Sequence, residues 1–410
     1  IDFFWIAAIG LVVLTALYTI FGGMKSVLYT SVLQTPILLL GSLIILVLGF
    51  KELGGWDEMM RVCGAVTVND YGDTMTNLIR SNDDANFPWL GALIGSAIIG
   101  FWYWCTDQFI VQRVLSGKNE KEARRGTIFG AYLKLLPVFL FLIPGMIAFA
   151  LHQKYIGAGG EGFLPMLANG TANADAAFPT LVAKLLPAGV KGLVVCGILA
   201  ALMSSLASLF NSSAMLFTID FYKRFRPETP EKKLVGIGQI ATVVIVILGI
   251  LWIPIMRSVG DVLYTYLQDV QSVLAPGIAA AFLLGICWKR TSAQGGMWGL
   301  IAGMVIGLTR LGAKVYYSNA GEVADSTFKY LFYDMNWLFF CGWMFLFCII
   351  VVIVVSLATE APTAEKIQGL VFGTATKEQK AATRASWDHW DIIHTAIILA
   401  ITAAFYWYFW

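Results

Sequence analysis

Three aromatic side chains followed by three hydrogen-bonding ones lie inside an otherwise apolar stretch of this chain. Residues 101–113 read Phe-Trp-Tyr-Trp-Cys-Thr-Asp-Gln-Phe-Ile-Val-Gln-Arg, and the apolar stretch 88–100 precedes them. A carboxylate such as that of Asp107 costs at least about 2.5–3.5 kcal/mol inside a membrane segment, so it normally faces a partner or a water-filled cavity. Aromatic faces such as those of Tyr103 and Trp104, beside fixed polar groups, are what a sugar-like solute needs. The segment is therefore a candidate solute site.

A lysine lies deep in the apolar stretch 126–151. Counted from Gly126, Lys134 is roughly 12 Å along a helix that would cross the membrane. Its ammonium could face a solute pathway, or it could form an ion pair with Asp107 at a comparable depth. The third reading is snorkelling, which works best within a turn or two of the interface.

Small and hydroxyl-bearing residues form a stripe in the apolar stretch 191–221. Ala201, Ser204, Ser205 and Ser208 share one face of a helix there. Small residues four apart let membrane helices approach closely, and this packing role is favoured by the residues alone. The alternative is an alkali-cation site, because uncharged hydroxyl and carbonyl oxygens can hold Na⁺ weakly enough to release it.

Polar side chains also lie in the stretch 262–288. Gln268, Asp269 and Gln271 precede Pro276 and Gly277, a pair that should break or kink a helix. Discontinuous helices in transporters expose backbone groups near the membrane midplane, where solutes bind. The alternative is a kinked helix whose Gln side chains bond to its neighbours.

The elements that must position these residues are membrane helices. The 410-residue chain is 58% hydrophobic and only 13% charged, against roughly 25% charged residues in soluble domains, which predicts a polytopic membrane protein. The sequence has neither a glycine-rich phosphate loop nor a His/Cys set at metal-ligand spacing, and this argues against an enzyme. Ten apolar stretches are long enough to cross a membrane: 3–21, 29–50, 88–113, 126–151, 191–221, 234–256, 262–288, 293–311, 335–358 and 391–410.

The loops between these stretches alternate in basicity. Lysine and arginine are concentrated around residues 113–125, 223–233, 289–290 and 366–384, whereas the loop 51–87 is acidic. Because a Lys/Arg bias marks the cytoplasmic side, we predict that the chain starts and ends outside and that loop 51–87 is extracellular. Residues 177–187 are too short to span and predict an interfacial helix.

Motifs spread along most of the chain resemble the sodium:solute symporter family, and within it the sodium/glucose cotransporters. The matching strings are Thr15-Ala-Leu-Tyr-Thr-Ile-Phe-Gly-Gly23, residues 102–113, Tyr132-Leu-Lys-Leu135, residues 203–212, Tyr266-Leu-Gln268 and Trp288-Lys-Arg290. The resemblance implies an all-α transporter fold with two inverted five-helix repeats. On that plan the chain is N-terminally incomplete, with the last two helices of the first repeat at 1–50, an extracellular loop at 51–87, the second repeat at 88–288 and flanking helices at 289–410.

The resemblance also implies a function and ligands. The family couples sodium to solute uptake by alternating access. The expected partners are therefore Na⁺ and a sugar or sugar-like solute that resembles a hexose, with no nucleic acid. The expected location is a plasma membrane, the inner membrane of a bacterium. The implied substrate contacts are Tyr103, Trp104, Lys134 and Gln268, with Asp107 in gating or an ion pair, and the implied Na⁺ ligands are Ala201, Ser204 and Ser205.

Three departures from the family pattern bear on coupling and on the solute. Ser31 stands where relatives commonly have Asp, and Ala207 where relatives with a second sodium site have Thr, so we expect one Na⁺ per solute. Gly100 replaces a polar sugar ligand, which leaves the identity of the sugar open. The alternatives are a sodium symporter for a polyol, a sugar acid or another organic solute, and a sensor module built on the transporter fold.

Overall fold

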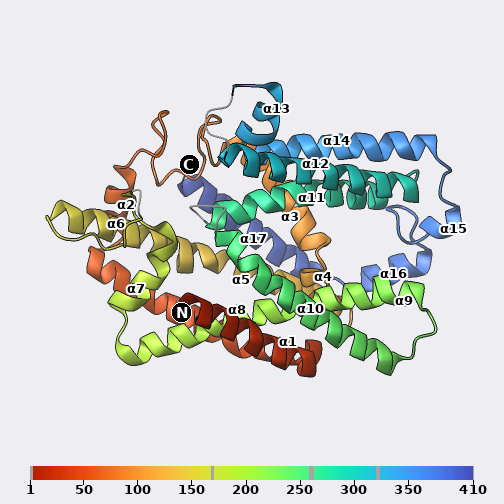
Figure 1. Cartoon of the computed structure of the whole chain (residues 1–410), viewed down its shortest axis with the longest axis horizontal. Coiled ribbons are helices and arrows are strands. Elements are labelled where there is room, and N and C mark those ends of the chain that lie inside the picture. Colours follow the sequence, from red (N-terminus) through yellow and green to blue (C-terminus); the bar gives the residue numbers. More distant parts are fainter. Residues whose placement is uncertain (1–2, 168–169, 258–262, 320–323, 410) are drawn as a thin grey trace. The chain divides into compact units, whose positions relative to one another are not determined.

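The computed structural model is helical and divides into two compact units (Figure 1). It describes residues 3–167, 170–257, 263–319 and 324–409. Unit 1 comprises residues 1–66 and 133–260, and unit 2 comprises residues 67–132 and 261–410. Within the described residues, eight helices are long and apolar enough to cross a membrane, or nine if one bent pair counts as a single span. The chain is an integral, multi-pass membrane protein.

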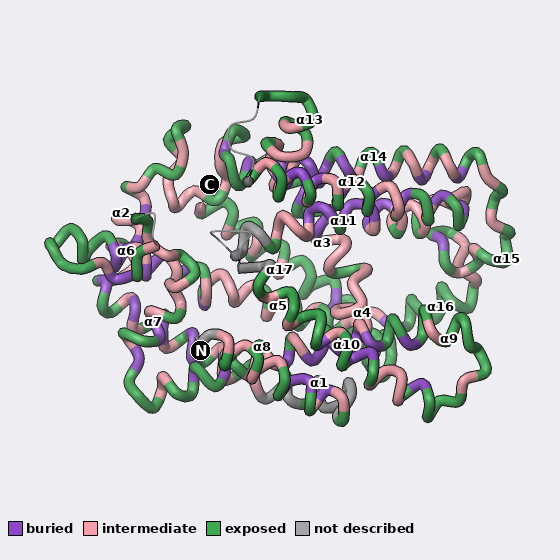
Figure 2. The backbone as a smooth tube through the Cα atoms, viewed as in Figure 1, coloured by how far each residue is buried: buried purple, intermediate pink, exposed green. Residues whose placement is uncertain are grey.

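The spans agree with the sequence prediction except at two places. Of the ten predicted spans, 3–21 corresponds to the shorter apolar helix Trp5–Phe21, too short to count among the eight. The predicted span 88–113 is the bent pair, made of α3 (Trp89–Cys105) and α4 (Gln108–Leu115). The least buried of the eight spans, α17 (His389–Tyr408), consists mostly of exposed and intermediate residues (Figure 2), as expected of a helix that faces lipid.

Unit 1 is built around α1 and α8. Its elements are α1 (Phe3–Leu53), α2 (Trp56–Gly64), the π-helical η1 (Val138–Leu142), α6 (Ile143–Gly157), η2 (Ala174–Ala176), α7 (Ala177–Leu185), α8 (Ala188–Met215), the π-helical η3 (Leu216–Tyr222), α9 (Lys223–Phe225) and α10 (Glu231–Arg257). Glycines allow the close approach of α1 and α8: a methyl group on Gly197 would lie 2.9 Å from Ile37. The short helix predicted at 177–187 is α7.

Both halves of α1 pack on the same part of α8. Ser31 hydrogen-bonds Ser204, and the Tyr18 hydroxyl donates to the carbonyl of Met203 at 2.8 Å. Ala16 packs with Phe210 in one buried cluster. The two segments predicted as separate spans, 3–21 and 29–50, therefore both contact the serine-rich part of α8.

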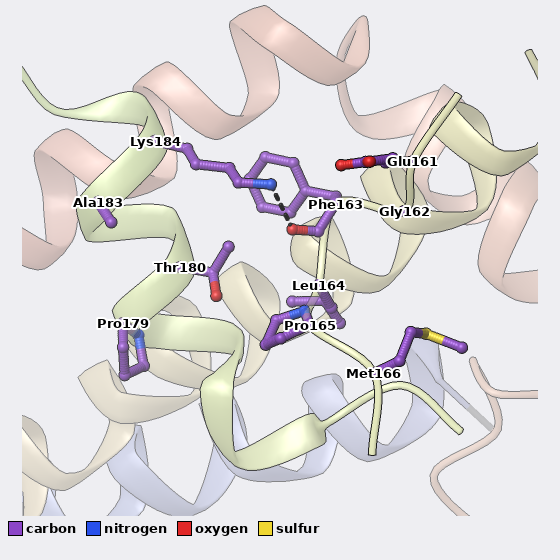
Figure 3. A pocket seen from close by; sticks show the side chains of 10 residues that line it. All are labelled: Glu161, Gly162, Phe163, Leu164, Pro165, Met166, Pro179, Thr180, Ala183 and Lys184. Atoms are coloured by element: carbon purple, nitrogen blue, oxygen red, sulfur yellow. Dashed lines mark hydrogen bonds between the residues drawn. The ribbon is translucent and has the colours of Figure 1, made fainter. Parts of the chain in front are cut away.

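A cavity of about 680 Å³ lies between α7 and the loop that follows α6 (Figure 3). The Lys184 ammonium donates to the carbonyl of Phe163 at 2.7 Å and lies 4.7 Å from the centre of its ring. Below this contact, the backbone N–H of Leu164 donates to Nδ1 of the buried His152 at 3.0 Å. These bonds hold the loop against α7 and α6, and none of the predicted site residues lines the cavity.

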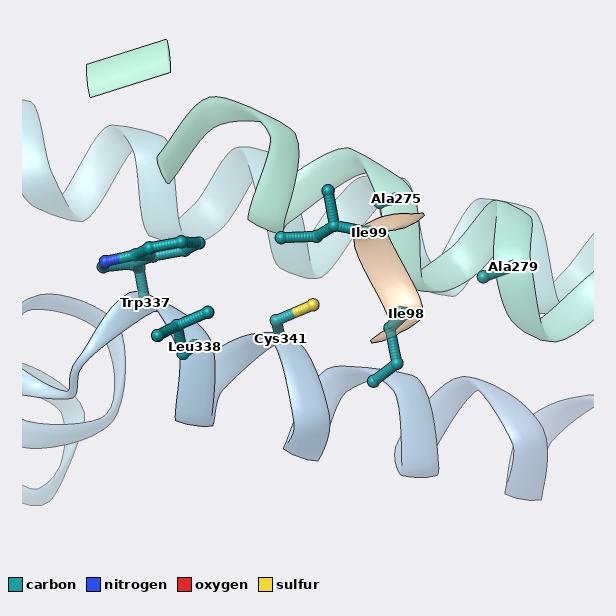
Figure 4. Packing of buried hydrophobic residues seen from close by; sticks show 7 residues of the cluster. All are labelled: Ile98, Ile99, Ala275, Ala279, Trp337, Leu338 and Cys341. Carbon is teal, nitrogen blue, oxygen red and sulfur yellow. The ribbon is translucent and has the colours of Figure 1, made fainter. Parts of the chain in front are cut away.

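Unit 2 packs α3, α11, α12 and α14 around apolar clusters. Its further elements are α5 (Glu120–Pro137, whose last turn belongs to unit 1), α11 (Leu263–Cys287), α12 (Ala293–Asn319), α13 (Thr327–Lys329), the π-helical η4 (Tyr330–Asp334), α14 (Trp337–Ala358), α15 (Ala364–Ile367) and α16 (Lys377–Ala385). One buried cluster joins Ile98 and Ile99 of α3 to two alanines of α11 and to Trp337, Leu338 and Cys341 of α14 (Figure 4). This cluster fixes α3 against α11 and α14.

The predicted break at Pro276 does not occur. Helix α11 continues through Pro276 to Cys287, so the discontinuous helix is not observed. Gly277 faces Gly303 of α12, where a methyl group on Gly303 would lie 2.8 Å from the Cα atom of Gly277. The glycine therefore serves close packing of two helices, as small residues do in membrane proteins.

Candidate functional site

The polar residues of the opening segment interrupt a membrane helix. Helices α3 and α4 meet at an angle of 47°, with Thr106 and Asp107 between them. The backbone of Asp107 is extended, and its carboxylate accepts a hydrogen bond from the N–H of Phe109 at 3.0 Å. The Thr106 hydroxyl donates to the carbonyl of Trp102 at 2.7 Å. The break therefore follows from a side-chain cap at each helix end, since Asp is a preferred N-cap residue.

The break brings two helix ends of opposite polarity to one point. The C-terminal end of α3 carries partial negative charge and the N-terminal end of α4 carries partial positive charge. Tyr103 and Trp104 lie in the last turn of α3, with ring centres 5.3 Å apart and planes at 89°. Trp104 is half exposed. Broken helices of this kind offer backbone groups and aromatic faces to polar solutes.

Beyond the break, two polar side chains of α4 lie toward the predicted cytoplasmic end. The Arg113 guanidinium lies 4.8 Å from the centre of the Phe109 ring. The buried Nε2 of Gln112 has no hydrogen-bond partner among the described residues. These two residues follow the aromatic pair within about ten positions, so they belong to the same polar stretch.

A buried charge cluster lies beside Gln268 on α11. The side chain of Arg310 on α12 is fully buried, and its Nη2 is 3.6 Å from Oδ1 of Asp269. The ammonium of Lys314 hydrogen-bonds the other carboxylate oxygen of Asp269. Arg310 also donates to the carbonyl of Met335 at 2.8 Å and lies 4.1 Å from the centre of the Phe340 ring. We call Asp269, Arg310 and Lys314 the charge cluster.

Sequence reasoning found Asp269 but missed its two partners. The predicted span ended at Leu311, whereas α12 continues to Asn319, so Lys314 lies within the helix. Arg310 and Lys314 are four residues apart, which places them on one face of the helix. That spacing was the available signal, since a second cation one turn from a buried arginine indicates a shared carboxylate.

Three of the predicted sugar contacts, Tyr103, Trp104 and Gln268, belong to unit 2. Gln268 directly precedes Asp269 of the charge cluster. Arg310 of this cluster donates to the carbonyl of Met335. The next residue, Asn336, donates to the carbonyl of Ala85 at 2.7 Å, shortly before α3 begins. Tyr103 comes fourteen residues after Trp89, the first residue of α3, which is about 21 Å of helix. Gln268 is thus linked, through the charge cluster and Asn336, to the segment that precedes α3, whereas Tyr103 lies in the last turn of this helix.

The predicted sodium ligands lie on α8 in unit 1. Ser204 is buried with 7% of its surface exposed, Ala201 is half-buried, and Ser205 is exposed. The Ser204 and Ser31 hydroxyls hydrogen-bond each other, and the buried Ser208 hydroxyl donates to the carbonyl of Ser204 at 3.0 Å. The structure therefore joins Ser31, one of the departures from the family pattern, to the predicted ligand Ser204.

This arrangement offers neutral oxygen atoms and no carboxylate. Within the described ranges, no group of three or more His, Cys, Asp or Glu residues could hold a metal ion. Hydroxyl and carbonyl oxygens suit a hard cation, and the absence of a formal charge suits a singly charged one held weakly. The arrangement can contribute to an alkali-cation site of this kind.

Lys134 lies in α5 and is exposed within unit 1. Asp107, with which it could form an ion pair, belongs to unit 2, and the two units are described separately. Asp107 already serves as the N-cap of α4, which gives its carboxylate a local role. The alternatives for Lys134 therefore stay as the sequence left them.

Comparison with known proteins identifies the family. The model of the "Sodium:solute symporter family" matches residues 4–303. The chain is 35% identical to the sodium/mannose cotransporter of Bos taurus over 427 aligned positions, covering 99% of this chain and 72% of that protein. It is also 35% identical to sodium/myo-inositol cotransporter 2 of Homo sapiens and to sodium/glucose cotransporter 4 of Mus musculus, covering 90% of this chain and 56% of each relative.

A solved structure shows the same fold. A Na⁺-coupled sialic acid symporter in a substrate-bound, outward-open state matches with a TM-score of 0.65 and 22% identity, covering 86% of this chain and 66% of that one. The chain thus spans a little over half the length of the inositol and glucose relatives and two thirds of the solved symporter. The family model covers well over half of this chain. The chain therefore belongs to the sodium:solute symporter family, a family of transporters and not of enzymes.

Proposed function

We propose that the protein is a sodium-coupled symporter that imports a sugar or sugar-like solute, such as a hexose or a cyclitol, with one Na⁺ per solute. Its relatives are named for mannose, myo-inositol and glucose, which supports a polyhydroxylated ring as the substrate class. Tyr103, Trp104, Lys134 and Gln268 would contact the solute, and Asp107 would shape the break that presents the aromatic pair. Ala201, Ser204 and Ser205 would bind Na⁺.

The observation that carries the proposal is the contact between Ser204 and Ser31. The predicted Na⁺ ligand Ser204 is buried, and it hydrogen-bonds the hydroxyl of Ser31 on α1. A second Na⁺ would add another positive charge to a region whose described residues offer only neutral oxygens. Placing a charge in such surroundings without a counter-charge is unfavourable, and this supports a single coupling ion.

The proposed architecture is the inverted repeat of the family. The last two helices of the first repeat would lie at 1–50, the second repeat at 88–288 and the flanking helices at 289–410, with the loop 51–87 outside. The two compact units cut across this division. Alternating access would then move parts of the repeats relative to each other, and Gln268 and Tyr103 would contact the solute from opposite sides.

Uptake into proteoliposomes tests the proposal. We expect an inward Na⁺ gradient, but not a K⁺ gradient, to drive uptake of mannose, glucose or myo-inositol. Ser204→Ala should raise the half-saturating Na⁺ concentration, whereas Ser212→Ala should not, because Ser212 is equally buried but bonds its own helix at the Leu209 carbonyl. Sodium-independent uptake would refute coupling, and uptake of sugar acids or other organic solutes alone would refute the sugar assignment.

Reversal potentials measured with the same vesicles test the stoichiometry. One Na⁺ per neutral solute predicts one positive charge moved per solute. A measured ratio of two would overturn the single-ion proposal while leaving sodium coupling intact.

A further inference from the structure

The end of the α8 helix extends beyond the thickness of a membrane. Residues 188–225 form an uninterrupted 38-residue helix through α8, η3 and α9. At about 1.5 Å per residue this is about 57 Å, against about 30 Å for the hydrocarbon core of a bilayer. Its last turns therefore lie at or beyond the headgroup level, on the side that the Lys/Arg bias predicts to be cytoplasmic.

Three phenylalanines line one side of these last turns. Phe217, Phe221 and Phe225 follow each other at four-residue spacing, with ring centres 5.5 and 5.2 Å apart. They are 44%, 57% and 69% exposed, so exposure increases toward the end of the helix. Apolar rings beside basic residues are typical of segments that lie in the membrane interface.

Unpaired basic side chains surround the phenylalanines. Lys223, Arg224 and Arg226 are exposed, as are the lysines at 232 and 233 that begin α10. Among the described residues none of the five has an ion-pair partner, although Asp220, Glu228 and Glu231 reduce the local net charge to +2. By contrast, Arg125 pairs with Asp388 at 3.2 Å. The basic side chains of the α8–α10 connection are therefore available to bind an anion from outside the chain.

A cleft lined by residues of α1, α8, η3 and α10 lies next to these charges. It has a volume of about 280 Å³, and Thr218, Ile219, Leu234 and Gln239 are among its lining residues. Ile219 lies one turn before Lys223, and Leu234 directly follows the two lysines of α10. The walls are mainly apolar, while Thr218 and Gln239 add polar groups. This combination matches the boundary between the acyl chains and the headgroup of a lipid.

We propose that this cleft, with the basic side chains around it, is a binding site for an anionic phospholipid of the cytoplasmic leaflet. The cleft would hold the glycerol ester region, the phenylalanines would contact acyl chains, and Lys223, Arg224 and Arg226 would bind the phosphate. Basic pockets between membrane helices on the cytoplasmic side recognise anionic headgroups in this way. The proposal is independent of which solute the protein carries.

Lipid binding to the purified protein in detergent tests the site. We expect native mass spectrometry to show retention of dioleoylphosphatidylglycerol in preference to dioleoylphosphatidylcholine. Each basic side chain removed should weaken binding about fivefold, and the triple variant Lys223→Gln, Arg224→Gln, Arg226→Gln should remove the preference. Raising NaCl from 0.05 to 0.5 M should weaken it as well, because the charges are exposed.

A second triple variant serves as the matched control. Lys366→Gln, Lys377→Gln and Lys380→Gln remove three exposed lysines of unit 2 on the same predicted side, none of which lines the cleft, and should leave lipid binding unchanged. All six side chains are exposed, so both variants should keep the wild-type melting temperature in phosphatidylcholine. Equal loss in both variants would overturn the site. Full competition by 10 mM inorganic phosphate would also overturn it, since that result indicates a phosphate site without a lipid.

Discussion

Removing the charge of Asp269 tests whether the charge cluster is a buried structural element. Asp269→Asn keeps the shape of the side chain and an oxygen that accepts from Lys314. It removes the negative charge 3.6 Å from the guanidinium of Arg310, whose side chain is only 1% exposed. The variant therefore leaves two cations on α12 without the carboxylate that they share.

The structure sets the expected magnitude through the exposure of each partner. Removing one member of a buried ion pair costs about 3–5 kcal/mol, because the remaining charge stays desolvated. Lys314 is 33% exposed, and the ion pair between Asp269 and Arg310 remains when Lys314 is replaced. Lys314→Met should therefore cost only about 0–1 kcal/mol, as exposed pairs do. We expect Asp269→Asn to destabilise the protein by at least about 2 kcal/mol more than Lys314→Met.

Unfolding in mixed micelles of dodecyl maltoside with increasing sodium dodecyl sulfate measures this difference, read by tryptophan fluorescence. A solute titration on the same samples adds a functional readout, because Asp269 directly follows Gln268 on α11. We expect Asp269→Asn to raise the half-saturating solute concentration more than Lys314→Met does. Equal destabilisation by the two variants would refute the reasoning, and so would an Asp269→Asn variant within 1 kcal/mol of wild type.

Three further predictions concern Gly303, Asp107 and Asp84. Gly303→Ala should destabilise the protein by about 1–3 kcal/mol, because the new methyl group would lie 2.8 Å from the Cα atom of Gly277. Gly312→Ala on the same helix meets nothing within 4 Å and should be neutral or stabilising in the same unfolding measurement. Asp107→Asn should retain transport, since Asn also caps helices, whereas Asp107→Ala should lose about 1 kcal/mol of stability; transport lost equally in both would show that the charge itself is needed. Burial acts to raise the pKa of Asp84, but hydrogen bonds from neighbouring backbone N–H groups outweigh it and lower the pKa. The ionised Asp84 carboxylate should stabilise loop 67–87 fully above the ordinary carboxylate pKa of about 3.9, and this stabilisation should be lost as the pH falls below that value. Proteolysis of the loop should then become faster in wild type but not in Asp84→Asn.

The sequence was sufficient for features that depend on local composition. Apolar stretches of about 20 residues predicted the spans because burying the backbone in lipid requires helices, whatever lies next to them. The bend in the span 88–113 was not predicted, although it falls at the polar residues 106–108. The capping role of Asp107 could also have been predicted, because an Asp before a renewed apolar helix is a common N-cap.

Features that depend on partners far apart in the chain could not be predicted in the same way. Pro276 predicted a break by its own chemistry, yet α11 continues through it, and the adjacent Gly277 packs against Gly303, which is 26 residues away. Asp269 was recognised only as a polar residue of the stretch 262–288, because its partner Arg310 is 41 residues away on a different helix. Ser31 was recognised only as a departure from a family pattern, and its contact with Ser204, 173 residues away, gives that departure a physical meaning. A hydroxyl now stands against the predicted sodium ligand where a carboxylate would add a charge. Ser31→Asp should therefore strengthen cation binding at Ser204, because the fold brings these two residues into contact.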